Sequence, residues 1–367
     1  MSNFYLNNKI SIFIVIVFIL NINVFSTTLI SQKRISLSQE KAILLNPGSF
    51  FVTETGNIYV VDRKDSNIKI FNKKGQLRKI FGRRGLGPDE FIKPMYSTYK
   101  DGFVAIEDMA RQTYFIYRID KNSGLKIVRK CLNNFLSSDF CFIDKKSLFI
   151  AGSKIGEDKE WKLPYIYNFV NERYEYIIPI EVAYGYNSYS EVGSAITGSL
   201  SYIQNDFFCD INKRFLYITS MANLRVVRIN RINRNVFVFG KKTKNYIKPF
   251  ENREIRKAYR ERNRKAIIKY INQMTNVMDI FVLNSGKVGL ILVGPEKNSS
   301  GLHVFLQLYN NNGKLIKEFE IVNSKVSELF DLKYYFKKSK NLIYILEPKI
   351  VEDFDMKFFV HVIKIKE

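Results

Sequence analysis

The chain has 367 residues, of which 46% are hydrophobic and 14% aromatic, and its 58 basic and 35 acidic residues give a net charge of +23. All-β domains reach this length as one unit, and the apolar content suffices for a large core. The three cysteines form no C-x-x-C pair, which excludes a cysteine metal centre of the usual spacing. The lysine excess is spread widely, so it is weaker evidence for an anionic partner than a cluster would be.

Residues 1–26 have the pattern of a secretory signal peptide. Lys9 supplies a positive charge, residues 10–20 form an apolar run, and Ser26 provides a small residue before a cleavage site. The apolar run is shorter than the roughly 20 residues that a membrane-spanning helix needs. We therefore expect an exported protein, either periplasmic, cell-surface or extracellular, with an uncleaved N-terminal anchor as the alternative.

The remainder of the chain, residues 27–367, repeats one strand pattern. Six strand starts follow polar turns at residues 56–62, 102–108, 146–152, 213–220, 284–292 and 340–346. Further alternating runs include residues 225–229, 304–309 and 358–363, and apolar alternation at period two indicates β-strands. A repeated four-strand unit cannot bury its faces alone, so it implies a ring of such units. We predict an all-β fold, a single six-bladed β-propeller of four-stranded antiparallel blades, which residues 29–37 close by pairing into the last blade.

The first two blades contain more specific motifs. The first reads Gly56-Asn57-Ile58-Tyr59-Val60-Val61-Asp62, and the second reads Phe81-Gly82-Arg83-Arg84-Gly85-Leu86-Gly87-Pro88-Asp89-Glu90-Phe91. Over about 70 residues the chain resembles the NHL-type, or TolB-like, six-bladed propellers of bacterial exported proteins, with Asp89 where that family usually has Gly. The resemblance implies a platform that binds a ligand, protein or RNA, or else a lactonase or lyase with a metal in the central channel.

A structural role explains these motifs. The glycines permit backbone angles that other residues avoid, and Phe91 is placed to insert between neighbouring sheets. Asp62 and Asp108 end their strands and are expected to hold the following turns through backbone hydrogen bonds. The glycine-rich stretch lacks the Gly-Lys-Ser/Thr ending of a phosphate-binding loop.

Two insertions widen the spacing between repeats. Residues 181–206 contain Tyr184, Tyr186 and Tyr189 among Gly and Ser, a composition typical of a recognition loop, although ordinary strand and turn would also fit it. Residues 241–276 are basic, and apolar residues at helical spacing predict a helix over about 251–275. These apolar residues are Ile255, Tyr259, Ile267, Tyr270, Ile271 and Met274. The candidate anion-binding residues on that helix are Arg253, Arg256, Lys257, Arg260 and Arg264.

The basic segment is the sharpest local signal in the sequence. Sixteen basic and three acidic residues lie between Arg225 and Lys269. Such clustering attracts anions over about 8–10 Å at physiological salt. Three interpretations stay open: a solvated helix that covers one propeller face, docking on an anionic lipid or envelope surface, and nucleic-acid binding. Export disfavours the last.

The sequence identifies no catalytic residue and no metal ligand. It lacks the H-E-x-x-H, G-x-S-x-G and P-loop motifs, and its two histidines, His303 and His361, both lie in apolar strands. A metal-dependent lactonase would use oxygen ligands from several blades, for which Glu54, Asp108 and Asn284 are candidates, together with a divalent cation. Without that activity no cofactor is expected.

The cysteines leave their redox state open. Cys131 and Cys141 are close enough in sequence to form a disulfide, and three buried free thiols, including Cys209, are the alternative.

Together these features favour a non-enzymatic binding or scaffold propeller outside the cytoplasm. Its partner would be a protein or an envelope polymer, with the basic helix turned toward an anionic surface. The alternative is a metal-dependent hydrolase, lactonase or lyase with its site in the central channel.

Overall fold

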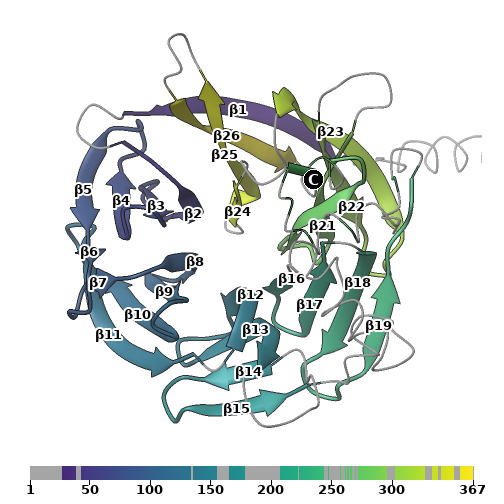
Figure 1. Cartoon of the computed structure of the whole chain (residues 1–367). Helices are drawn as coiled ribbons and strands as arrows, with labels where there is room; N and C mark the ends of the chain where they lie inside the picture. The colour runs from purple at the N-terminus through teal and green to yellow at the C-terminus, as the bar shows by residue number, and fades with distance from the viewer. Residues whose placement is uncertain are drawn as a thin grey trace, which may run out of the picture.

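The computed structural model describes the strands of a six-bladed β-propeller (Figure 1). The described residues are 27–38, 43–133, 135–154, 165–177, 207–221, 223–243, 247, 257, 261, 263, 265, 266, 269, 272–295, 302–326, 333–337, 340–350 and 356–366. The signal segment, residues 1–26, and the tyrosine-rich insertion, residues 181–206, therefore lie outside them.

Each blade is a four-stranded antiparallel sheet whose strands follow one another from the channel outward. The first blade consists of β2 (Pro47–Val52), β3 (Ile58–Asp62), β4 (Asn67–Phe71) and β5 (Leu77–Phe81). The second consists of β8 (Pro94–Lys100), β9 (Phe103–Asp108), β10 (Thr113–Ile119) and β11 (Leu125–Leu132). The third consists of β12 (Phe135–Phe142), β13 (Ser147–Lys154), β14 (Tyr165–Asn168) and β15 (Arg173–Tyr176).

The second half of the ring repeats this plan. The fourth blade consists of β16 (Phe207–Ile211), β17 (Phe215–Ser220), β18 (Asn223–Asn230) and β19 (Val236–Phe239). The fifth consists of β20 (Asn276–Val282), β21 (Val288–Pro295), β22 (Leu302–Tyr309) and β23 (Leu315–Val326). The sixth consists of β24 (Lys333–Lys337), β25 (Leu342–Ile350), β26 (Met356–Lys366) and, outermost, β1 (Thr28–Leu37). All six predicted strand starts are thus confirmed.

The first strand closes the ring, as the sequence predicts. β1 pairs antiparallel with β26, from Thr28 opposite Lys366 to Leu37 opposite Phe358. Ile35 and Leu37 alternate with exposed residues and are buried, because one face of β1 packs against the neighbouring blade. The last blade therefore combines the two ends of the propeller sequence, which removes the need for an unpaired terminal sheet.

The glycine-rich loop after β5 packs closely around the side chains of Phe91 and Glu90. Two short strands, β6 (Arg83–Arg84) and β7 (Glu90–Phe91), pair in parallel within it. Gly82 has φ +78°, and a Cβ atom there would lie 2.7 Å from the Phe91 ring. Phe91 is fully buried and meets Phe115 of the second blade edge-on at 5.3 Å between ring centroids. This confirms the expected insertion of Phe91 into the core between the first two blades.

Asp62 and Asp108 hold the segments that lead into the inner strands. The Asp62 carboxylate accepts hydrogen bonds from the backbone N–H groups of Leu45 at 2.8 Å and Asn46 at 3.1 Å. The Asp108 carboxylate accepts equivalent bonds from Ile92 at 2.7 Å and Lys93 at 3.0 Å. Both carboxylates are fully buried. The prediction of a structural role is therefore confirmed, and it argues against Asp108 as a metal ligand.

In the first blade a buried lysine completes this arrangement. Lys69 is 1% exposed, and its ammonium donates to Asp62 at 2.7 Å and to the Ile43 carbonyl at 2.6 Å. Burial alone raises the pKa of Asp62, but the hydrogen bonds from Lys69 and Leu45 outweigh it and hold the pKa below its usual value. This contribution to stability is therefore present at neutral pH and is lost as the pH falls through the folded-state pKa.

The predicted helix over about 251–275 is not seen in the described residues. Helical backbone is described only at isolated positions, namely Lys257, Lys265, Ala266 and Lys269. Most of the residues around them lie outside the described part. Met274, which the helical spacing included, instead precedes β20, and its side chain is fully buried in the core of the fifth and sixth blades. Met274 is therefore apolar because it packs in the ring, and not because it belongs to a helix. No helix in the described part of the chain is long and apolar enough to cross a membrane.

Replacement of Lys69 tests the buried ion pair. Lys69→Met should lower the free energy of unfolding by about 3 kcal/mol, because it leaves the Asp62 charge buried without its counter-ion. The exposed Lys79 of the same blade provides the control, and Lys79→Met should change stability by less than about 0.5 kcal/mol. Urea unfolding followed by tryptophan and tyrosine fluorescence measures both. Equal stability of the two variants would contradict the role of Lys69 as the counter-ion of Asp62.

Candidate functional site: the central channel and a pocket at its rim

Three aspartates lie on inner strands of consecutive blades. They are Asp139 on β12, Asp210 on β16 and Asp279 on β20. Asp139 accepts a hydrogen bond from the Cys209 N–H of the next blade at 2.9 Å, and Asp210 accepts one from the Val282 N–H of the blade after that at 2.6 Å. The carboxylates of Asp139 and Asp210 therefore link their own blades to the following ones.

The sheet topology explains why N–H groups of one blade bond to a carboxylate of the preceding blade. An inner strand pairs only with the second strand of its blade, so the N–H groups on its channel edge have no partner within the sheet. A buried N–H without a hydrogen bond is costly. The second oxygen of each aspartate is occupied locally, because it accepts from the following residue's N–H: Phe140 at 2.8 Å, Ile211 at 2.7 Å and Ile280 at 2.7 Å.

The proximity of these carboxylates changes their acidity. Burial raises the pKa of Asp139 to about 7, and the nearby Asp210 charge raises it further against the lowering effect of the backbone N–H groups. Burial, together with the charges of Asp139 and Asp210, also raises the pKa of Asp279 well above its usual value. The three aspartates are half-buried. Asp139 is therefore poised to exchange a proton near neutral pH.

Aromatic and hydroxyl side chains connect the inner strands of the first two blades. Phe51 on β2 stacks on Tyr99 of β8 at 5.4 Å between ring centroids, and the Ser49 and Ser97 hydroxyls lie 2.8 Å apart. Burial raises the pKa of Tyr334 on β24 well above its usual value, and the Asp279 charge adds to this effect. Carboxylates thus link the third to fifth blades, whereas aromatic and hydroxyl contacts link the first two.

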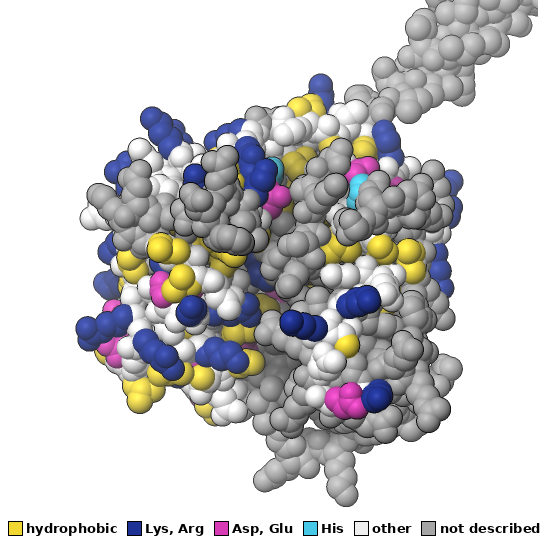
Figure 2. Space-filling model, turned by 45° about the horizontal axis from the view of Figure 1, so that its top comes forward, with side chains coloured by type: hydrophobic (Ala, Val, Ile, Leu, Met, Phe, Trp, Pro, Cys, Tyr) yellow, Lys and Arg dark blue, Asp and Glu magenta, His cyan; other side chains and the backbone are white. Residues whose placement is uncertain are grey.

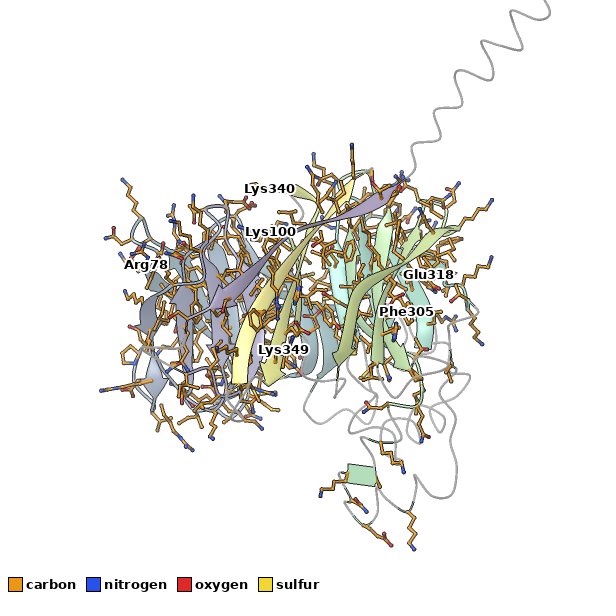
Figure 3. The ribbon with its side chains drawn as sticks, turned by 90° about the horizontal axis from the view of Figure 1, so that it is seen from above. Arg78, Lys100, Phe305, Glu318, Lys340 and Lys349 are labelled. Atoms are coloured by element: carbon orange, nitrogen blue, oxygen red, sulfur yellow. The ribbon has the colours of Figure 1, made fainter. Side chains whose placement is uncertain are left out.

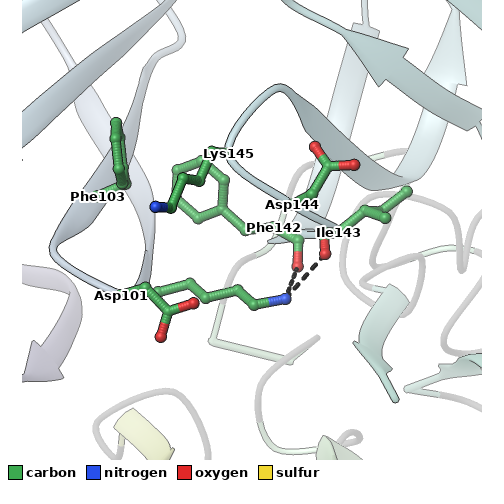
Figure 4. Close-up of a pocket in the computed structure, with 7 residues that line it drawn as sticks. Asp101, Phe103, Phe142, Ile143, Asp144 and Lys145 are labelled. Atoms are coloured by element: carbon green, nitrogen blue, oxygen red, sulfur yellow. Dashed lines mark hydrogen bonds between the residues drawn. The ribbon is translucent and has the colours of Figure 1, made fainter. Parts of the chain in front are cut away.

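A pocket opens at the rim between the second and third blades (Figure 4). Its volume is about 260 Å³, and its lining comprises Lys100, Asp101, Phe103, Phe142, Ile143, Asp144 and Lys145. The Lys100 ammonium donates to the carbonyl oxygens of Ile143 at 2.8 Å and Phe142 at 3.3 Å, which ties the two blades together. Lys145 lies with its ammonium 6.0 Å from the centroid of the Phe103 ring. The lining thus combines aromatic rings with two lysines and two aspartates, Asp101 and Asp144, so its formal charges balance.

Most of the predicted site residues fall outside the described part of the chain. This applies to Tyr184, Tyr186, Tyr189, Arg253, Arg256, Arg260 and Arg264. Lys257 is described: its side chain is 71% exposed and forms a 3.8 Å ion pair with Glu261. Whether these residues bind a ligand stays a prediction.

The described basic residues of the same segment divide into two groups. The arginines of the β18–β19 hairpin serve the fold: Arg228 lies over the Phe215 and Phe237 rings, and Arg234 pairs with Glu175. The lysines are exposed to solvent, namely Lys241, Lys242, Lys257, Lys265 and Lys269. The short helical ribbon between β19 and β20 lies on the opposite side of the ring from Lys340 (Figure 3). Lys and Arg side chains outnumber acidic ones on the face shown in Figure 2.

The candidate ligands of the enzyme alternative do not converge. Glu54 and Asn284 lie in turns that follow β2 and β20, whereas Asp108 caps its own blade. Within the described ranges no group of three or more His, Cys, Asp or Glu residues is placed to hold a metal ion. The histidines lie on strands, as expected, where His303 contacts Glu320 at 2.6 Å and His361 contacts Glu347 at 2.6 Å.

Sequence reasoning missed the three channel aspartates. Each stands as a single acid within an apolar strand, as in Asp139-Phe140, Asp210-Ile211 and Asp279-Ile280. An isolated carboxylate at a buried strand position is a signal in itself, because burial of a charge requires compensation.

Comparisons with known proteins support the fold. No family model and no curated protein matches the chain, so the NHL or TolB-like resemblance has no support from a family match. A member of the DUF4221 family from Bacteroides vulgatus has a similar structure, with a TM-score of 0.62 and 15% identity over 93% of this chain and 99% of that one. A Bacteroides fragilis protein whose name suggests export has a TM-score of 0.58 and 13% identity over 92% of this chain and 96% of that one.

A third similar structure is an enzyme. The virginiamycin B lyase from Staphylococcus aureus has a TM-score of 0.44 and 13% identity over 92% of this chain and 99% of that one. At identities this low the likeness concerns the propeller fold and does not extend to activity.

The raised pKa of Asp139 gives a prediction on pH dependence. A carboxyl group whose folded-state pKa lies above its unfolded value stabilises the fold at low pH, and this contribution is lost as the pH rises from about 4 through about 7. Asp139→Asn replaces the titratable carboxyl group by a neutral amide and keeps one acceptor oxygen. Relative to the unaltered protein, the variant should therefore gain about 2 kcal/mol of unfolding free energy between pH 5 and pH 8. Urea midpoints at the two pH values measure this, and a difference that does not change with pH would contradict it.

Proposed function

We propose that this protein is an exported, non-enzymatic binding platform. Loops at one end of the ring would hold a protein or envelope ligand, and the basic segment after β19 would face an anionic surface. The observation that supports this most is the use of the channel carboxylates. Asp139 and Asp210 are engaged by backbone N–H groups of neighbouring blades, so they serve to hold the ring together.

The pocket between the second and third blades is a suitable place for the ligand. It lies where the turns that follow the inner strands β8 and β12 meet, and it combines Lys100 and Lys145 with the rings of Phe103 and Phe142. Binding residues are commonly found on such loops, because a rigid scaffold positions them. The similar Bacteroides fragilis structure, whose name suggests export, agrees with a location outside the cytoplasm.

The basic segment provides the long-range attraction. Its exposed lysines include Lys241, Lys257, Lys265 and Lys269, and only Lys257 among them has an acidic partner in the described ion pairs, at 3.8 Å. Each Lys or Arg held close to an anionic lipid surface contributes about 1 kcal/mol. Several such residues together give a salt-sensitive attachment without a shaped pocket.

Charge neutralisation tests the surface attachment. A variant with Arg253, Arg256, Arg260 and Arg264 changed to Gln should bind vesicles of phosphatidylglycerol and phosphatidylcholine at least about tenfold more weakly at low salt. Its affinity should also depend less on salt. Co-sedimentation at several salt concentrations provides the measurement.

A matched variant controls for net charge. Lys73, Lys74, Arg78 and Lys79 are exposed on the first blade, and their change to Gln removes the same four charges. This control should bind nearly as well as the unaltered protein. Equal losses in both variants would show that net charge alone drives binding, and no loss in either would reject surface docking.

The enzyme alternative has one observation in its favour. Asp139 has a pKa of about 7, a value suited to a general acid or base, and the Asp210 charge lies close to it. A hydrolase, lactonase or lyase would place its substrate in the channel, with a divalent cation as its cofactor. Under that alternative, lactone hydrolysis by the purified protein with added calcium or zinc should be lost in Asp139→Asn. Absence of turnover across a panel of lactones would support the platform.

A further inference from the structure

Two cysteines from neighbouring blades face each other beside the channel. The Sγ atoms of Cys141 on β12 and Cys209 on β16 lie 3.7 Å apart. Cys209 is buried and Cys141 half-buried. The third cysteine, Cys131, is buried on β11, where its thiol donates to the Phe169 carbonyl oxygen at 3.8 Å. The structure therefore pairs Cys141 with Cys209, and it does not place Cys131 beside Cys141 as the sequence spacing suggested.

The aspartate link fixes this pairing. Asp139 and Cys141 are two residues apart on β12, so their side chains leave the strand on the same face. Because Asp139 reaches the backbone N–H of Cys209 at 2.9 Å, the Cys141 side chain is also directed at β16. The strands β12 and β16 pack together along the channel. The approach of the two sulfurs thus follows from the backbone arrangement.

We propose that Cys141 and Cys209 form a disulfide bond that joins the third and fourth blades. A disulfide requires about 2.05 Å between the sulfurs, so the observed 3.7 Å separation must shorten by about 1.7 Å. Rotation of the two side chains about their Cα–Cβ bonds can supply a movement of this size. An oxidising compartment is where such a bond would persist, and this part of the inference rests on the proposed export.

The reaction is thiol–disulfide exchange with a small or protein-bound disulfide as oxidant. The Cys141 thiolate attacks one sulfur of the oxidant, forms a mixed disulfide and releases the first thiolate. The Cys209 thiolate then attacks the Cys141 sulfur and releases the second. Two protons from the cysteines pass to the two released thiolates, so the oxidant gains two electrons and the protein loses two.

The environment of the pair makes the exchange slow in the folded protein. Burial raises the pKa of the Cys209 thiol well above its usual value, and the neighbouring Cys141 and Asp139 raise it further. The half-buried Cys141 is the accessible partner for the first attack. Once formed, the bond would close a long loop between residues 141 and 209 and would stabilise the protein by restricting its unfolded chain.

Thiol counting on the purified, folded protein tests the bond independently of export. The protein is incubated with oxidised glutathione at pH 8, unfolded, alkylated with N-ethylmaleimide and weighed by mass spectrometry. We expect one adduct per chain after oxidation and three after reduction, since Cys131 alone remains free. Non-reducing peptide mapping should show the peptides of Cys141 and Cys209 joined, and the unfolding midpoint should rise on oxidation.

Single substitutions provide the controls. Cys131→Ser should lose its one remaining adduct after oxidation, whereas Cys141→Ser and Cys209→Ser should each retain two under both conditions. Three adducts after prolonged oxidation, glutathione attached to Cys141 without a link, or a link to Cys131 would overturn the proposal. If a variant does not fold, the peptide map of the unaltered protein still decides the pairing. Failure of the bond would leave the vesicle result unaffected.

Discussion

Hydrogen bonds from the free edges of inner strands to carboxylates join the third, fourth and fifth blades. Every inner strand pairs on one side only, and its other edge faces the channel. In the fourth and fifth blades an aspartate from the preceding blade accepts from this edge: Asp139 accepts from the Cys209 N–H and Asp210 from the Val282 N–H. These bonds align consecutive blades, and the aromatic and aliphatic side chains between the sheets then supply the larger apolar burial.

The first two blades use their buried carboxylates differently from the third and fourth blades. In the first two blades the carboxylate lies at the end of the second strand, where Asp62 and Asp108 hold the chain segment that enters the same blade. In the third and fourth blades the carboxylate lies on the inner strand and reaches the next blade, as Asp139 and Asp210 do. The sequence motif that ends in Asp62 and Asp108 has no counterpart beyond the second blade, and this change in structural mechanism explains why.

The distribution of charge follows from this architecture. Acidic groups that would repel one another are held inside by backbone N–H groups, and the cost of this arrangement appears as the raised pKa values of Asp139 and Asp279. The exposed charges are predominantly basic, in accordance with the net charge of +23.

The sequence by itself determined the six strand starts, the closing strand at residues 29–37 and the roles of Phe91, Asp62 and Asp108, because strand alternation, turn residues and caps are local patterns. The tertiary structure alone decided what faces the channel and what meets across blades. Met274 fits a helical spacing yet packs in the ring, because burial between blades overrides a local pattern. Asp139 and Cys209 are 70 residues apart, Cys141 and Cys209 are 68 apart, and Asp210 and Val282 are 72 apart. Which of them touch depends on how separate sheets pack, and no periodicity within one strand contains that information.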